Sequence, residues 1–178
     1  MITEVTTSLN DVDIETVGAL IGAVQDDSAK AHTVWKANVK WTGAFRSEAT
    51  IRDFAPLQSD EPTALGGDDT APNPVEQLLG ALGNCLAVGY AANATAAGIT
   101  LKDLEIDLEG DLNLHTFLGL DDGGHAGYHA IRANVRLDAD ATDEQITALH
   151  QRVIGTSPVG HTLVQPIDVA IDVDFARQ

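Results

Sequence analysis

The sequence has few of the residues on which metal-binding, disulfide-rich and nucleic-acid-binding proteins depend. It contains one cysteine, 4% aromatic residues, and 10 Lys and Arg residues against 27 Asp and Glu residues, for a net charge of −17. One cysteine cannot form an intramolecular disulfide. A surface this negative repels phosphate backbones and anionic lipid. We therefore expect neither a nucleic-acid partner nor a membrane partner.

Targeting segments and known cofactor motifs are also missing. No apolar run reaches the roughly 20 residues that a membrane span requires, and residues 1–10 lack the basic and apolar regions of a signal peptide. We find no phosphate-binding loop, dinucleotide fingerprint, HExxH or GxSxG motif. His125 and His129 are four positions apart, but they lie in a glycine-containing loop without a matching Cys or carboxylate pattern. The sequence predicts a soluble cytoplasmic protein with no metal and no cofactor.

What is present is a hydrophobic content of 44% in 178 residues, which suffices for one core and predicts a single domain over residues 1–178. Apolar residues at helical spacing predict an amphipathic helix over 11–26, within an N-terminal extension of residues 1–30. Asp11 or Asp13 could cap it. Residues 33–54 have a strand-like pattern with a turn at Thr42-Gly43, which indicates a hairpin. Residues 55–73 contain half of the prolines and a Gly66-Gly67 pair, and they predict a long ordered loop.

The longest predicted helix covers residues 74–97. Pro74 suits its first turn and Gly98 suits the position after its end. Apolar residues make one broad stripe along it: Leu78, Leu79, Leu82, Cys85, Leu86 and Tyr90. Glycines cost a helix about 1 kcal/mol each relative to alanine, so Gly80, Gly83 and Gly89 indicate close approach of another backbone or of a ligand. We expect this helix to be central.

Alternating apolar and polar residues predict strands at 104–109, 131–137 and 167–175, with residues 117–128 connecting the first two. Between the second and third strands, Thr142 and Gln145 have the spacing of a capping box and predict a helix that buries Ile146, Leu149, Val153 and Ile154. If the last strand pairs beside 131–137, its aspartates could face Arg132 and Arg136. Strands that come in antiparallel pairs predict the α+β class.

Cys85 is the main candidate for chemistry. Most lone free cysteines are small buried hydrophobic residues. A reactive thiol needs a neighbour that favours the thiolate, which is the nucleophile. Cys85 lies too far from the helix start for the helix dipole to supply this. Arg46 and Arg52 on the N-terminal hairpin are the candidate cations, and each is otherwise an ordinary solvated arginine of a strand.

The stretch Asn73 to Leu86 resembles the central-helix signature of the OsmC/Ohr family: an Asn-Pro dipeptide, an acidic residue, an apolar run, small residues and then Cys. The sequences Gly98-Ile99 and Ser157-Pro158-Val159 also fit this family. The resemblance covers roughly residues 32–176 and includes the element order. The N-terminal helix and the segment 117–120 are similar to a longer, single-cysteine OsmC-like subgroup.

The resemblance implies an OsmC-like fold, in which an antiparallel sheet wraps a long central helix, and an intertwined homodimer with two sites at its interface. It implies a bacterial stress-response, peroxiredoxin-like oxidoreductase. In such proteins a cysteine attacks an organic hydroperoxide, an Arg and a Glu polarise the site, and a second cysteine resolves the product. Cys85 matches the attacking cysteine and Arg46, or next Arg52, matches the Arg. Ser157 stands at the resolving position.

Two differences from the family pattern matter. A hydroxyl at Ser157 cannot form a disulfide, and the family's Glu falls on Val75, with Glu76 one residue and about 100° of helix later. The first hypothesis is therefore a one-cysteine hydroperoxide reductase that uses an external thiol reductant, with an apolar pocket from Leu78, Leu82, Leu86 and partner residues. The alternatives are a dimeric binding module for a small apolar ligand, in which Cys85 is structural, and a redox-sensing protein.

Overall fold

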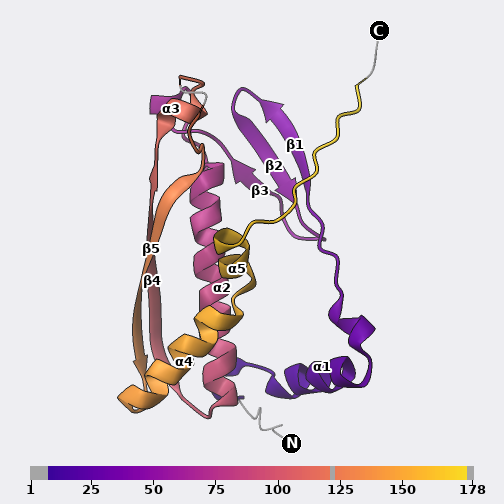
Figure 1. Ribbon diagram of the computed structural model, residues 1–178, viewed down its shortest axis with the longest axis vertical. Coiled ribbons are helices and arrows are strands. Elements are labelled where there is room, and N and C mark those ends of the chain that lie inside the picture. The colour runs from indigo at the N-terminus through magenta and orange to yellow at the C-terminus, as the bar shows by residue number, and fades with distance from the viewer. Residues whose placement is uncertain (1–7, 121–122, 176–178) are drawn as a thin grey trace, which may run out of the picture.

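The computed structural model describes residues 8–120 and 123–175 of the chain (Figure 1). The expectation about a signal peptide at residues 1–10 therefore falls mostly outside the described residues, as does part of the predicted connection 117–128. The helices are α1 (Ile14–Asp26), α2 (Pro74–Ala96), α3 (Leu114–Phe117), α4 (Asp143–Thr156) and α5 (Pro158–Val164). The strands are β1 (Asn38–Gly43), β2 (Arg46–Thr50), β3 (Leu57–Ser59), β4 (Leu101–Leu112) and β5 (Tyr128–Ala139).

Helix α2 runs through the middle of the molecule, as the sequence predicts (Figure 1). Asn73 caps it in a capping box: its Oδ1 accepts from the backbone N of Glu76 at 2.9 Å, and Glu76 Oε2 accepts from the backbone N of Asn73 at 2.8 Å. Pro74 occupies the first turn, where a missing N–H costs nothing. Gly98 has a φ of 69° just past the helix end, a conformation that suits glycine.

The strands β4 and β5 form a long antiparallel ribbon beside α2, and α4 packs against another side of the helix (Figure 1). The core lies where these elements meet. It consists of Leu86, Tyr90, Ala94, Ile99, Leu149 and Val153, with the inward residues of the ribbon packed around it. Of the predicted inward face of α4, Leu149 and Val153 are buried, whereas Ile154 is exposed. That part of the prediction was wrong, because α4 contacts α2 along a narrower stripe.

Two glycines of α2 allow this close packing. A Cβ at Gly83 would lie 2.8 Å from Leu108 Cδ1 on β4, and a Cβ at Gly89 would lie 3.0 Å from Val153 Cγ1 on α4. Gly80 has open space around it within the chain. The expectation that glycines mark close approach thus holds for two of these three positions.

The N-terminal strands make a separate antiparallel sheet with the order β1-β2-β3. The hairpin turn lies at Ala44-Phe45, two residues later than predicted, and Ala44 has a φ of 49°. Residues 55–73 are not only a loop, since they contain β3, which pairs with β2 from Leu57 to Ser59. The three-residue strand is too short to give an alternating pattern in the sequence.

The rest of this segment is organised by Asp60, whose side chain is only 1% exposed. Its carboxylate accepts hydrogen bonds from the backbone N–H groups of Glu61, Asp68 and Thr70 and from the Thr70 hydroxyl. Burial alone would raise the pKa of Asp60, but these donors together hold it below its ordinary value. The buried carboxylate therefore fixes the loop that leads into α2.

Helix α1 extends away from the main body (Figure 1). Asp13, one of the two predicted caps, accepts from the backbone N of Thr16 at 3.0 Å. Asn10, which lies before α1 in the sequence, attaches the N-terminal segment to the end of α2. Its Nδ2 donates to Thr95 Oγ1 and to the Ile99 carbonyl, and its Oδ1 accepts from the backbone N of Leu101. The apolar residues Leu20 and Ile21 of α1 are exposed.

The predicted C-terminal strand is not a strand in the single chain. Residues 165–175 run as an extended segment away from the other elements, and Ile171 is 87% exposed (Figure 1). The predicted pairing with Arg132 and Arg136 is also wrong. Arg132 pairs with Glu109 and Asp111, and Arg136 pairs with Glu105 and Asp107, all across the β4–β5 ladder. The ribbon supplies its own acidic partners, because its polar residues from both strands face the same side.

Candidate active site around Cys85

Cys85 and Ser157 come together from distant parts of the chain. Cys85 Sγ lies 3.2 Å from Ser157 Oγ, within hydrogen-bond distance for sulfur, although 72 positions separate them. The cysteine is half-buried and the serine is 5% exposed. The two residues that the sequence assigns to the attacking and resolving positions are therefore neighbours in the fold.

Ser157 is held in place by the helix that follows it. As the N-cap of α5, its Oγ accepts a hydrogen bond from the backbone N–H of Gly160 at 3.1 Å. Gly160 has little free space, since a Cβ there would lie 3.0 Å from Ser157 Oγ. Because this N–H occupies an acceptor position of the hydroxyl, the hydroxyl proton remains available to Cys85 Sγ. The arrangement can donate a hydrogen bond to a thiolate.

A cavity of about 420 Å³ opens beside the thiol. It lies between α2, the end of α4 and the start of α5. Its lining is Asn84, Cys85, Val88, Gly89, Ala92, Asn93, Val153, Thr156, Ser157 and Pro158. The sequence predicts Leu78, Leu82 and Leu86 instead, and none of these lines the cavity. Leu86 belongs to the core, whereas Val88 and Ala92 lie on the same side of α2 as the thiol.

Arg46 is not at the thiol in the single chain. It begins β2 and its guanidinium pairs with Asp68, which lies in the loop fixed by Asp60. Within the part of the chain that the structure describes, no hydrogen bond or ion pair joins Arg46 to Cys85. The hairpin that carries it stands at the end of the molecule where α2 begins (Figure 1).

Arg52, the second candidate, is also engaged locally. It follows β2 with a φ of 51°, and its guanidinium carbon lies 4.6 Å from the centre of the Phe54 ring. This distance is that of a cation–π contact. Nothing in the described chain brings Arg52 toward the thiol.

Glu76 has a structural role at the start of α2, where its carboxylate completes the capping box. It lies nine positions before Cys85 on the same helix, which corresponds to a rise of about 13.5 Å. A carboxylate at that distance cannot contact the thiol of its own chain. Val75 presents its backbone carbonyl to the Tyr128 hydroxyl at 3.0 Å and contributes no acid.

A second polar pair lies on the other side of the core. The Tyr90 hydroxyl is 2.5 Å from His150 Nδ1, and burial raises the pKa of Tyr90. The phenol thus stays neutral and can donate to the imidazole, which satisfies a group that is 2% exposed.

Neither a cluster of metal ligands nor a membrane-spanning helix is found among the described residues. Residues 8–120 and 123–175 hold no group of three or more His, Cys, Asp or Glu that could bind a metal ion. His125 and His129 meet edge to face, with ring centres 5.8 Å apart. Among the described helices, none is long and apolar enough to cross a membrane.

The sequence identified Cys85 and Ser157 as candidate site residues, but it could not predict that their side chains would be in contact. It missed Asp68 as the partner of Arg46 and the α4 residues Val153 and Thr156 as part of the cavity. A signal for the second group exists in Gly89, because a glycine in mid-helix indicates a close neighbour. That signal does not identify which element is the neighbour.

Together these features define a class: an α+β protein whose long central helix presents a half-buried thiol to a buried hydroxyl and an apolar cavity. The family model described as OsmC-like protein matches residues 66–172. The chain belongs to this family. The match covers more than half of the chain and begins after the hairpin that carries Arg46.

Among curated proteins, the chain is similar to the uncharacterized protein YmaD of Bacillus subtilis (strain 168). The two are 29% identical over 126 residues, which cover 69% of this chain and 78% of that protein.

Solved structures with the same fold include an OsmC-like protein from Mycoplasma pneumoniae. It has a TM-score of 0.64 and 17% identity, and the match covers 74% of this chain and 88% of that one. An organic hydroperoxide resistance protein OsmC from Legionella pneumophila has a TM-score of 0.52 and 18% identity, with coverage of 74% and 91%. A putative organic hydroperoxide resistance protein from Vibrio cholerae, with captopril bound in one of the active sites, has the same TM-score and identity, with coverage of 74% and 86%. At these identities the likeness establishes the OsmC-like α+β fold.

Proposed function

We propose that this protein reduces organic hydroperoxides at Cys85 by a one-cysteine mechanism, in a reducing cytoplasm. The observation that carries the proposal is the contact between Cys85 Sγ and Ser157 Oγ at the edge of an apolar cavity. Similarity to proteins named for organic hydroperoxide resistance supports the substrate class. A half-buried thiol with a hydroxyl donor also suits a nucleophile better than a residue that serves only for packing.

In the first step the thiolate attacks the distal oxygen of the hydroperoxide. The O–O bond breaks, the sulfur becomes a sulfenic acid, and the alkoxide takes a proton from solvent and leaves as an alcohol. Ser157 donates a hydrogen bond to the thiolate and so positions it. The apolar side chains Val88, Ala92 and Val153 favour an alkyl hydroperoxide over hydrogen peroxide, which has no apolar part.

In the second step an external thiol closes the cycle. It condenses with the sulfenic acid to a mixed disulfide and releases water. A second thiol then attacks this disulfide, which regenerates Cys85 and releases the oxidised reductant. An external reductant is required because Ser157 has no sulfur and the chain has no second cysteine.

We further propose that the working form is a homodimer. Glu76 of one chain cannot reach the thiol of the same chain, and Arg46 is held at Asp68, so a polarising group for Cys85 has to come from a second copy. Exposed apolar surface supports this assembly. Trp41 is 72% exposed, and the apolar residues at every second position of the C-terminal segment, from Ile167 to Phe175, are also exposed. Contiguous exposed apolar surface is typical of protein–protein contacts.

A steady-state assay tests the proposal. With an organic hydroperoxide and dithiothreitol, the wild type should consume peroxide catalytically and Cys85→Ser should not. Ser157→Ala should slow the reaction by about tenfold, the effect of losing one hydrogen bond to a charged group. Peroxide consumption by Cys85→Ser equal to that of the wild type would exclude the mechanism.

The second candidate function is the binding of a small apolar ligand beside an unreactive cysteine. The cavity of about 420 Å³ favours it, as do the local roles of Glu76 and Arg46 within their own chain. This reading predicts that Cys85→Ser binds the same apolar ligands as the wild type, and that neither protein consumes peroxide.

A further inference from the structure

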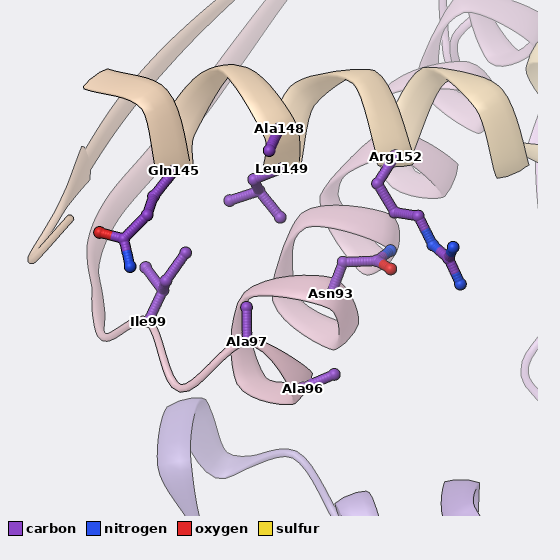
Figure 2. Close-up of a pocket in the computed structure, with 8 residues that line it drawn as sticks. All are labelled: Asn93, Ala96, Ala97, Ile99, Gln145, Ala148, Leu149 and Arg152. Carbon is purple, nitrogen blue, oxygen red and sulfur yellow. The ribbon is translucent and has the colours of Figure 1, made fainter. Parts of the chain in front are cut away.

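A second cavity lies between the end of α2 and α4, apart from the cavity that holds Cys85 (Figure 2). Its volume is about 350 Å³. Its lining is Asn93, Ala96, Ala97, Ile99, Gln145, Ala148, Leu149 and Arg152. Asn93 is the one residue that it shares with the cavity at the thiol. A cavity of this size is within the range of small-molecule sites.

The middle of this cavity is apolar. Ile99 is 3% exposed and Leu149 is 5% exposed, so both form its floor, and the methyl groups of three alanines complete the surface. In Figure 2 the side chain of Leu149 points from α4 into the space above Ala97. Such a surface gains free energy when it covers an apolar group, at about 25 cal/mol per Å².

The polar groups at the edge retain unused hydrogen-bonding capacity. Gln145 uses its Oε1 to accept from the backbone N of Thr142 at 2.9 Å, which leaves its Nε2 as a free donor. Asn93 uses its Nδ2 to donate to the Gly89 carbonyl at 2.8 Å, which leaves its Oδ1 as a free acceptor. Figure 2 shows the Gln145 nitrogen pointing toward Ile99, and Arg152 beside Asn93 at the other end of the cavity.

The charge at this cavity is unusual for so acidic a chain. No acidic side chain lines it, and Arg152 makes no ion pair within residues 8–120 and 123–175. The other described arginines are engaged: Arg46, Arg132 and Arg136 with carboxylates, and Arg52 with Phe54. An unpaired guanidinium at the edge of an apolar cavity is suited to bind a carboxylate through two hydrogen bonds.

We infer that this cavity binds a medium-chain carboxylic acid. The carboxylate pairs with Arg152 and the chain lies over Leu149 and Ile99. Arg152 and Gln145 are seven positions apart on α4, a rise of about 10.5 Å, which sets the length of the apolar part that fits between them. An oxygen at the far end of the ligand would accept a hydrogen bond from Gln145 Nε2. This inference does not depend on any reaction at Cys85.

Octanoate is the probe, and binding is measured by calorimetry and by backbone amide NMR without peroxide. We expect shifts at residues that line the cavity. Arg152→Gln should weaken binding by about tenfold or more, the effect of losing a charge-assisted hydrogen bond. Arg152→Lys, which keeps the charge but loses the paired hydrogen bonds, should bind more tightly than Arg152→Gln and more weakly than the wild type. Lys36→Gln, which removes one exposed positive charge elsewhere, should change the affinity by less than about twofold, as expected for a distant screened charge.

Two further measurements fix the location and the ligand class. Ala148→Leu fills the cavity from an exposed helical position and should abolish octanoate binding while the fold is retained. Octan-1-ol, which lacks the carboxylate, should bind the wild type about tenfold more weakly and should not distinguish Arg152→Gln. Equal binding of the alcohol and the acid, an unchanged affinity in Ala148→Leu, or no octanoate binding at all would overturn the inference.

Discussion

Replacing Ser157 by cysteine should create a two-cysteine reaction cycle in this chain. The distance of 3.2 Å between Cys85 Sγ and Ser157 Oγ is about 1.2 Å longer than a disulfide bond of about 2.05 Å. The longer C–S bond and a small rotation at each side chain can supply that difference. In Ser157→Cys, the sulfenic acid formed at Cys85 should therefore condense with the new thiol, with loss of water, to give an intramolecular disulfide.

The disulfide should also stabilise the fold. It would join positions 72 residues apart. For a loop of that length, the chain-entropy model gives a stabilisation of about 4 kcal/mol at 25 °C. The free energy of unfolding of the oxidised variant should exceed that of its reduced form by up to this amount, measured by urea denaturation with and without reductant.

Intact mass spectrometry after one equivalent of organic hydroperoxide measures the outcome. Ser157→Cys should lose two hydrogens and both of its alkylatable thiols, whereas the wild type should gain one oxygen at Cys85. Ser157→Ala serves as the control, because it should gain one oxygen as the wild type does, although more slowly, and form no disulfide. A gain of one oxygen with one alkylatable thiol remaining in Ser157→Cys would refute the geometry, because it would mean that the sulfenic acid at Cys85 does not meet the new thiol.

Three further predictions concern packing, pH and assembly. Gly89→Ala should lower the free energy of unfolding by about 1 kcal/mol, since its Cβ would lie 3.0 Å from buried Val153. Gly155→Ala, with open space around it, should raise the free energy of unfolding by up to about 1 kcal/mol. If urea denaturation shows similar stabilisation of both variants, the tight α2–α4 contact is contradicted. The depressed pKa of Asp60 means that its carboxylate stabilises the fold above about pH 4, and this contribution is lost as the pH falls through the folded pKa. The difference in the free energy of unfolding between wild type and Asp60→Asn should therefore shrink in acid. A constant difference from pH 7 to pH 3 would argue against this role of Asp60. Ile171→Asp should convert the proposed homodimer to a monomer in sedimentation velocity, because it places a charge on the apolar side of the extended C-terminal segment; a variant that stays dimeric would exclude this segment from the interface.

The parts of the fold that the sequence predicts well are those with local signals. Helix α2 follows from Asn73, Pro74 and Gly98, and helix α4 follows from the capping box at Thr142 and Gln145. The ribbon of β4 and β5 follows from strict alternation. Strand β3 was missed because three residues carry no period. The stretch 167–175 shows strand alternation but joins neither sheet of the described residues, because alternation identifies an amphipathic strand and not the edge with which it pairs.

The site shows the same division between local and long-range information. Cys85 and Ser157 can be named from short motifs, but their contact depends on how α5 packs against α2. The family resemblance implied Arg46 near the thiol and left Glu76 only as a possible site residue, whereas within one chain they contact Asp68 and the backbone of Asn73. In the proposed homodimer these residues would reach Cys85 from a second copy, and a single sequence carries no direct signal for a contact between two chains.

The central claim is that Cys85 is a nucleophile toward organic hydroperoxides. The purified protein, treated with one equivalent of an organic hydroperoxide and trapped with a sulfenic-acid reagent, should show one adduct by intact mass. The adduct should be absent from Cys85→Ser and should form faster with the organic hydroperoxide than with hydrogen peroxide. If Cys85 reacts no faster than free cysteine, the account of this site as a hydroperoxide reductase is contradicted, and the cavity beside the thiol is a ligand site.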